Sequence, residues 1–328
     1  MRACIAGWGT AVPESRLTNH DLEQRVDTSD AWIVERTGIR ERRIAAPDET
    51  TASLAIEAGT AAIKQAGITP DDVELLIVAT ATPEQPIPHT GAFVGDGLGL
   101  SCGSFDLAAG CAGFVYELVT GAALLTSGNL RYVLVIGAET LSRIVDPADR
   151  GTCILFGDGA AAVVLEPSDD DSTGLLAWDL GCDGSATGLL EIPAGGSRLP
   201  TTPATIAEGQ QFIKMQGQEV FRRAVRAVVN SARAALDRAG VSAADVHHFV
   251  PHQANLRIIE AAANRLKIPS ERTVVNIGQY GNTSAASIPL ALAEAAESGR
   301  IADGDLILLS GFGAGMTWGS AVLRWGRA

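Results

Sequence analysis

The sequence predicts an α/β fold composed of two similar halves. Helical patterns alternate with short apolar runs typical of buried strands, and this alternation indicates layers of helices on sheets. The second half repeats the order of the first as a weaker copy. A break that is acidic and contains Ser and Pro, residues 166–173, lies between the copies. We therefore divide the chain into two halves, residues 1–168 and 169–328, packed about a pseudo-twofold axis.

The first half opens with a buried strand at residues 4–9, and Thr18 is a candidate cap for the helix that follows. The later elements are predicted from runs of apolar residues, and most of them end at Gly or at polar residues. These elements are a helix over 51–65, a strand over 73–80, a helix over 112–127, and strands over 132–139 and 160–165.

The second half supplies counterparts for most of these elements. They are a helix over 217–239, a strand over 246–250, a helix of small residues over 284–298, and strands over 306–311 and 315–323. Polar groups follow the ends of predicted strands at two places, His252 and Asn282. Open α/β sheets bind ligands at the carboxyl ends of their strands, so both side chains are candidates for a functional site. The alternatives are a capping or surface histidine and an ordinary turn asparagine.

Cys111 precedes a helix that is apolar on every face. From Ala112 to Ser127 only Glu117 is charged, which predicts a buried helix rather than an amphipathic one. A cysteine at the first turn of such a helix meets free backbone N–H groups and the positive end of the helix dipole, so we expect its pKa to be lowered. The alternative is a small core residue, because free cysteine is commonly buried.

Composition excludes several classes of function. The net charge of −13 argues against a nucleic-acid-binding surface. The five cysteines form no CxxC pair, so we expect a reducing cytoplasm, no disulfides and no zinc. The first apolar stretch is broken by Gly7, Gly9 and Pro13, and we expect no later run that approaches the roughly 18 residues of a membrane span.

Several motifs in the same order resemble one family. They are Ala109 to Phe114 around Cys111, Pro251 to Asn255 around His252, Gly281 to Ser287 around Asn282, Trp32 to Ile39, Asp149 to Gly151, Phe156 to Ala160, and Gly311 to Gly315. Together they resemble the β-ketoacyl-acyl-carrier-protein synthase III family over residues 5–324. The resemblance implies a thiolase-like, duplicated five-layered α-β-α-β-α architecture and a homodimer.

The resemblance also implies the chemistry. Cys111 would attack an acyl-CoA thioester, and malonyl-acyl carrier protein would then lose CO2 and condense with the acyl-cysteine. His252 and Asn282 would donate hydrogen bonds to the thioester oxygen as charge develops there, and His252 would also help Cys111 ionise. Backbone N–H groups of Cys111 and of the turn at Gly313 and Ala314 would bind the tetrahedral oxyanion.

Substrate contacts follow from the same resemblance. Thr28, Trp32, Arg36, Arg150, Gly217 and Asn255 would bind CoA, with Trp32 and Arg150 enclosing the adenine. Ile87, reaching across the dimer, and Phe312 would line the acyl pocket, and Arg222, Arg257 and Arg265 would receive the acidic carrier protein. The resemblance implies no cofactor, because acyl-CoA is a substrate. It also implies no metal, no nucleic acid and no membrane.

Three features depart from the family pattern. Ala314 stands where many relatives have glycine, residues 193–212 form a longer loop that would reshape the tunnel mouth, and an aliphatic Ile87 would admit a starter longer or more branched than acetyl. The starter, the pathway and the cognate carrier protein stay open. Alternatives are a related acyltransferase or starter-unit synthase of polyketide or secondary metabolism, a plant-type polyketide synthase, a thiolase or hydroxymethylglutaryl-CoA synthase, and a non-catalytic acyl-binding module.

Overall fold

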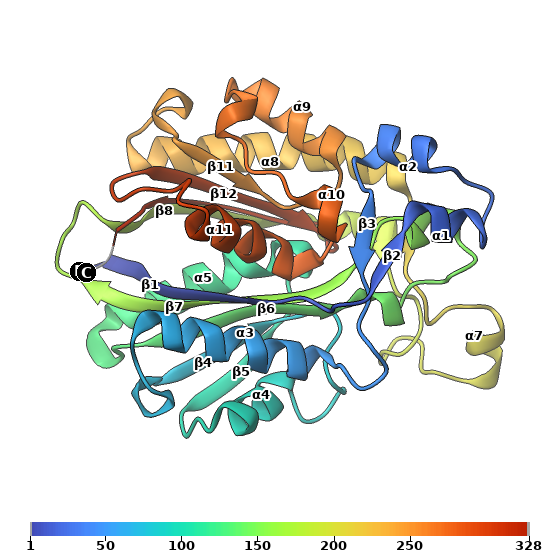
Figure 1. Cartoon of the computed structure of the whole chain (residues 1–328), viewed down its shortest axis with the longest axis horizontal. Helices are drawn as coiled ribbons and strands as arrows, with labels where there is room; N and C mark the ends of the chain where they lie inside the picture. The colour runs from blue at the N-terminus through green and yellow to red at the C-terminus, as the bar shows by residue number, and fades with distance from the viewer. Residues whose placement is uncertain (1, 327–328) are drawn as a thin grey trace.

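The computed structural model describes residues 2–326, and these form five layers in the order α-β-α-β-α (Figure 1). Two sheets lie on either side of a central layer of helices, and further helices cover their outer faces. The central helices are α5 (Gly113–Leu124) and α11 (Ser287–Glu297); the outer ones are α3 (Thr51–Ala66) and α4 (Thr90–Leu98) on one side and α8 (Gly217–Ala239) and α9 (Leu256–Leu266) on the other. The predicted duplicated α/β architecture is confirmed.

The first sheet has five strands in the order β1-β7-β6-β4-β5. They are β1 (Arg2–Ala11), β4 (Leu75–Ala79), β5 (Gly103–Leu107), β6 (Val133–Thr140) and β7 (Asp158–Ser168). Strand β4 runs parallel to β5 and β6, whereas β7 runs antiparallel to both β6 and β1. The parallel strands therefore present their carboxyl ends, and the loops that follow, at one edge of the sheet.

The second sheet has four strands in the order β11-β12-β13-β8. They are β8 (Gly174–Cys182), β11 (His248–Pro251), β12 (Leu306–Gly313) and β13 (Thr317–Arg324). β11 is parallel to β12, and β13 is antiparallel to β12 and β8, which repeats the relation of β4, β6, β7 and β1. The second sheet lacks a counterpart of β5.

The chain passes from one sheet to the other between Ser168 and Gly174. The division into halves at 168 and 169 stays a prediction, and its outer ends, residue 1 and residues 327–328, lie outside the described residues. Shorter elements surround the loops between the strands: β2 (Arg16–Thr18), β3 (Glu41–Arg43), β9 (Leu190–Glu191), β10 (Lys214–Met215), α1 (Asn19–Glu23), α2 (Asp30–Thr37), α6 (Arg150–Cys153), α7 (Pro203–Ala207) and α10 (Ile277–Tyr280).

The two sheets close on α5, the helix predicted to be buried. Phe114 and Leu118 on α5 pack with Ile288 and Leu292 on α11, and all four are at most 2% exposed. Gly110–Asn129 is long and apolar enough, by length and composition alone, to cross a membrane. The expectation that no run approaches that length is therefore wrong. The apolar character of this stretch is explained by its place between the sheets.

A backbone-to-backbone contact brings the central helices close to the first sheet. A Cβ placed on Gly137 of β6 would lie 2.4 Å from the carbonyl oxygen of Ala285, in the turn before α11. No side chain fits in that space, so glycine lets this turn lie directly on the sheet. The turn follows Asn282, which the contact therefore brings to the carboxyl edge of β6.

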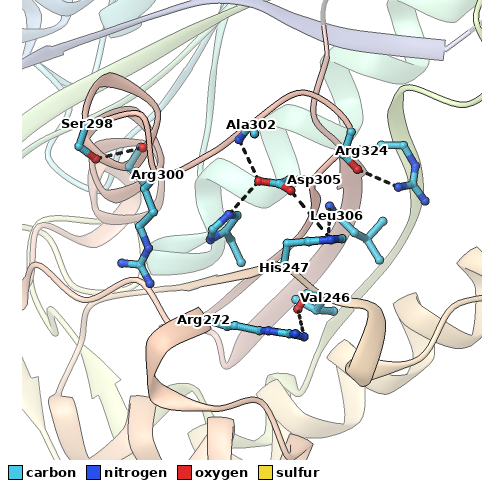
Figure 2. A network of polar contacts seen from close by, with 12 residues as sticks. Val246, His247, Arg272, Ser298, Arg300, Ala302, Asp305, Leu306 and Arg324 are labelled. Carbon is cyan, nitrogen blue, oxygen red and sulfur yellow. Dashed lines mark hydrogen bonds and ion pairs between the residues drawn. The ribbon is translucent and has the colours of Figure 1, made fainter.

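Polar contacts fix the start of β11 against the start of β12 (Figure 2). His247 Nδ1 accepts a hydrogen bond from the Leu306 N–H at 3.0 Å. The His248 ring lies 3.0 Å from the Asp305 carboxylate, which also accepts from the Ala302 N–H at 2.8 Å. These contacts lock the register of the two parallel strands at the end opposite to His252. They therefore help to determine where His252 emerges.

Glu117 is the one charged residue of α5, and its side chain is fully buried. Neither carboxyl oxygen has a hydrogen-bond partner within residues 2–326. Burial raises the pKa of Glu117 well above its ordinary value, and nearby backbone groups of Ala79 and Ile136 oppose this only in part. The carboxyl group is thus held neutral in the folded chain at an energetic cost.

Replacing this carboxyl group is expected to stabilise the protein in a pH-dependent way. Between the ordinary glutamate pKa and the raised pKa of Glu117, the folded chain binds more protons than the unfolded chain, so stability falls as pH rises. Each unit of elevation costs about 1.4 kcal/mol. Thermal unfolding should give Glu117→Gln a higher melting temperature than the wild type at pH 8, with a smaller gap at pH 5. The exposed Glu57→Gln is the control, and equal gaps at both pH values would contradict the assignment.

Candidate active site

Cys111, His252 and Asn282 line one cavity of about 610 Å³. Cys111 lies in the 3-10 turn Gly110–Ala112 that leads into α5, His252 directly follows β11, and Asn282 lies in the loop before α11. Their exposed fractions are 8%, 6% and 6%. Three residues from distant parts of the chain therefore line one cavity.

The end of β12 packs directly against the turn that carries Cys111. A Cβ placed on Gly313 would lie 2.3 Å from the Cys111 nitrogen, so only glycine permits this approach. The Gly313 backbone lines the cavity beside the Cys111 turn. Ala314, the other predicted oxyanion donor, is not among the lining residues, and its backbone lies close to Gly110. The arrangement favours Gly313 over Ala314 at the oxyanion position.

Asn282 is held by its backbone between two residues of the first half. Its N–H donates to the Leu155 carbonyl at 2.8 Å, and its carbonyl accepts from the Gly157 N–H at 3.0 Å. The side-chain oxygen accepts from the Ser284 N–H at 2.9 Å. Because the oxygen is engaged, the amide NH2 is the part of the side chain left to interact with a ligand. Asn282 therefore offers a hydrogen-bond donor to the cavity.

His252 is placed by β12 and by its neighbour Gln253. The His252 N–H donates to the Ser310 carbonyl at 2.8 Å. Gln253 is buried, and its amide donates to the carbonyls of Pro251 and Val274 and accepts from the Asn276 and Ile277 N–H groups. This one side chain joins the loop that carries His252 to the loop that precedes Asn282. Gln253 lies within the motif around His252 but was not predicted to have a role.

Burial makes both ionisable groups of the site neutral. It lowers the pKa of His252 to about 3, so the imidazole is uncharged at physiological pH. Burial raises the pKa of Cys111 to about 12; a hydrogen bond from the Ser284 side chain opposes this rise and the Glu139 carboxylate adds to it. The prediction that the helix dipole lowers the Cys111 pKa is therefore wrong for the resting protein. Desolvation of the buried thiol outweighs the helix dipole.

Trp32 and Arg36, on α2, line the mouth of the cavity. The guanidinium carbon of Arg36 lies 4.7 Å from the centre of the Trp32 ring, and that of Arg150 lies 4.9 Å from it. Arg150 also donates to the Asp27 carbonyl at 2.7 Å. An adenine placed between Trp32 and Arg150 would first have to displace the Arg150 side chain.

The remaining predicted CoA contacts differ in their surroundings. Gly217 and Asn255 line the cavity. The Asn255 side chain accepts from the Arg257 N–H at the start of α9 and donates to the Arg36 carbonyl at 3.0 Å, so it joins α9 to α2 at the mouth. Thr28 is not among the lining residues, and its buried hydroxyl has no partner within residues 2–326. These assignments stay predictions.

The two predicted acyl-pocket residues lie apart in this chain. Phe312, at the end of β12, lines the cavity, whereas Ile87 does not and is 85% exposed. The long loop 193–212 contains α7 and projects from the body (Figure 1). None of residues 193–212 lines the cavity; Leu190 and Met215, which lie on either side of the loop in the sequence, do. The lining of this cavity therefore does not support the prediction that residues 193–212 reshape the tunnel mouth.

The three predicted docking arginines are spread along α8 and α9. Arg222 and Arg257 line the cavity mouth. Arg222 pairs with Glu219 at 2.7 Å, and Arg257 lies 5.8 Å from the centre of the Phe221 ring. Arg265 is exposed in the last turn of α9, two turns from Arg257. Two of the three therefore border the entrance.

Within the described part of the chain, no group of three or more His, Cys, Asp or Glu side chains could hold a metal ion. The chemistry that this arrangement supports is nucleophilic attack by sulfur beside hydrogen-bond donors from an imidazole and a carboxamide. Both donors suit a developing negative oxygen.

Comparisons with known proteins point to one family. Family models described as 3-oxoacyl-[acyl-carrier-protein] synthase III and its C-terminal part match residues 105–184 and 236–325. The β-ketoacyl-[acyl-carrier-protein] synthase III of Roseiflexus castenholzii is 51% identical, and the alignment covers 98% of each chain. The solved 3-oxoacyl-(acyl carrier protein) synthase III of Pseudomonas aeruginosa is 44% identical with a TM-score of 0.92, covering 100% of this chain and 99% of that one.

A further solved structure carries a different name. The priming β-ketosynthase of the R1128 polyketide biosynthetic pathway is 37% identical with a TM-score of 0.91, covering 98% of this chain and 96% of that one.

The raised Cys111 pKa predicts how the thiol reacts with an alkylating agent. At pH 7 to 9 the thiolate is a small fraction that grows about tenfold per pH unit. The rate of Cys111 carbamidomethylation by iodoacetamide should therefore keep rising through pH 9. Peptide mass spectrometry distinguishes Cys111 from the exposed Cys182, which serves as an internal control. A plateau for Cys111 near pH 7 would show that its thiolate is stabilised after all.

Proposed function

This chain belongs to the β-ketoacyl-acyl-carrier-protein synthase III family, and we propose that Cys111, His252 and Asn282 carry out the condensation for which the family is named. It is an acyltransferase-type condensing enzyme that initiates fatty acid synthesis. The observation that supports the residue assignment is the cavity that all three share.

The first half-reaction transfers an acyl group from CoA to Cys111. The sulfur forms a bond to the thioester carbonyl carbon, the bond from that carbon to the CoA sulfur breaks, and the thiol proton ends on CoA. No net proton is released, so a resting thiol of high pKa is compatible with the exchange. Backbone N–H groups of Cys111 and Gly313 are the donors we assign to the tetrahedral oxyanion.

The second half-reaction uses the hydrogen-bond donors of His252 and Asn282, which both lie in the second half of the chain. Malonyl-acyl carrier protein loses CO2, and the electrons of the broken carbon–carbon bond form a thioester enolate. Its carbon attacks the acyl-cysteine, the bond from the acyl carbon to sulfur breaks, and Cys111 leaves as a thiolate that takes up a proton from water to return to the resting thiol. A neutral imidazole and the Asn282 NH2 stabilise the enolate oxygen without a base, because no carbon-bound proton is removed.

We also propose a homodimer. β5 ends the five-stranded sheet, and among the described residues no strand pairs with its outer edge, which is a surface that a second sheet can extend. The exposed Ile87 lies in the loop before α4, the helix that packs beside β5. In a dimer formed through this edge, Ile87 of one protomer would lie toward the acyl pocket of its partner. A cytoplasmic location fits the five free cysteines.

A second candidate is a starter-unit synthase of a polyketide pathway, which the similarity to the R1128 priming enzyme favours. The same site would perform the same chemistry there. The carrier protein that the enzyme accepts separates the two pathways.

Variants at two catalytic positions should separate the half-reactions. With acetyl-CoA and malonyl-acyl carrier protein, the wild type should release CO2 and form a ketoacyl product. Cys111→Ala should give no acyl adduct by intact mass. Asn282→Asp should keep the acyl adduct but lower CO2 release by about 100-fold or more, because one oxyanion donor is lost. Acyl transfer without CO2 in the wild type would contradict the condensing function.

Reversing a positive charge at the cavity mouth should weaken the use of malonyl-acyl carrier protein but not of malonyl-CoA. The chain has a net charge of −13, so an acidic partner needs a local basic surface. Arg257→Glu should raise KM for malonyl-acyl carrier protein about tenfold and leave activity with malonyl-CoA unchanged. Arg131→Glu, on the exposed surface before β6, is the control. Equal effects of the two variants would show that Arg257 is not a docking residue.

A further inference from the structure

The side chain of Ser287 contacts the catalytic histidine on the ring nitrogen that faces away from the chemistry. Its hydroxyl oxygen lies 2.6 Å from His252 Nδ1. Ser287 is the first residue of α11 and is 1% exposed. Both partners are therefore shielded from water, and each must satisfy its hydrogen bonds within the protein.

A second contact determines the direction of that hydrogen bond. The Gln253 N–H lies 3.3 Å from the same Ser287 oxygen. A backbone N–H can only donate, so the oxygen acts as the acceptor in this contact. The hydroxyl proton then needs an acceptor of its own, and within the described residues His252 Nδ1 is the acceptor in contact with it. The hydroxyl therefore donates to Nδ1.

This direction fixes the tautomer of His252. A neutral imidazole has one N–H and one bare nitrogen, and a nitrogen that accepts a hydrogen bond is the bare one. When Nδ1 accepts from Ser287, the ring proton is on Nε2. His252 lines the cavity, and Ser287 occupies its Nδ1, so Nε2 is the nitrogen left to meet a substrate.

We propose that Ser287 is a positioning residue that holds His252 as the Nε2–H tautomer, so that a donor faces the thioester oxygen. This rests on the proposed function, and of the two roles predicted for His252 it keeps stabilisation of the oxygen and removes assistance to Cys111 ionisation. A protonated Nε2 has no lone pair to take the Cys111 proton. His252 thus stabilises the enolate rather than acting as the base for the thiol.

The same logic operates at Asn282. There the Ser284 N–H occupies the amide oxygen and leaves the NH2 for the cavity. At both residues, a hydrogen bond to one polar atom of the side chain leaves its other polar atom free to contact the substrate. The two serines lie three residues apart, on either side of the start of α11.

The tautomer can be measured in the resting enzyme, independently of turnover. In protein labelled with ¹⁵N-histidine, NMR should show His252 protonated at Nε2 in the wild type and in Ser287→Thr. Ser287→Ala should show protonation at Nδ1 or a mixture of tautomers. The His252→Gln variant assigns the signal among the five histidines. A wild-type signal from Nδ1–H, or an unchanged tautomer in Ser287→Ala, would overturn the proposal.

Kinetics provide the second readout. Ser287→Ala should lower CO2 release from malonyl-acyl carrier protein by about 10-fold to 100-fold, less than removal of a whole oxyanion donor. Acylation of Cys111 should change less than about threefold, since backbone donors serve that step. Ser287→Thr should restore decarboxylation, and a parallel loss of both steps in Ser287→Ala would indicate a merely structural role.

Two controls complete the design. Ser298→Ala makes the same substitution at the other end of α11 and should leave both steps and the tautomer unchanged. Thermal unfolding establishes that each variant is folded before its kinetics are compared. A wild type that fails to release CO2 would refute the proposed function and leave the tautomer result standing, so the two failures are distinguishable.

Discussion

The active site depends on direct contact between backbones from the two sheets. The end of β12 approaches the Cys111 turn so closely that a Cβ on Gly313 would lie 2.3 Å from the Cys111 nitrogen. The turn before α11 approaches β6 in the same way, at Gly137. Side chains of ordinary size would hold these layers apart, because protein interiors are close-packed. Without both contacts the sulfur and the two donors would not share a cavity.

The site performs its chemistry with neutral groups. A buried thiol, an uncharged imidazole and a carboxamide carry no net charge in the resting state, and charge appears only as the reaction proceeds. Fixed dipoles in a buried site stabilise such transient charge without having to reorient. The charged residues Arg36, Arg222 and Arg257 lie at the mouth instead. In the proposed enzyme, the residues assigned to recognition would thus lie nearer the mouth than the residues assigned to catalysis.

Much of the fold could be predicted from patterns in the sequence. The helix predicted over 217–239 is α8 to the residue, and the predicted strand over 132–139 differs from β6 by one residue at each end. Strand β8 and helices α4 and α9 were not predicted. β8 has mixed polarity as an edge strand, with Trp178 41% exposed. In α4, three glycines weaken the helical signal.

What could not be predicted about the site from the sequence has a different cause. Motifs identified Cys111, His252 and Asn282, but the state of the thiol depends on burial by residues remote in sequence, which no local pattern reports. Ser287 and Gln253 were present in the motifs and had no assigned role, because their partners are settled by the packing of α11 on the His252 loop. Asn282 joins Leu155 and Gly157 through its own backbone, so a residue of the second half is part of the hydrogen-bonded framework of the first. Because the loop that carries Asn282 is hydrogen-bonded into the first half, we expect that a fragment containing either half alone would lack a complete cavity.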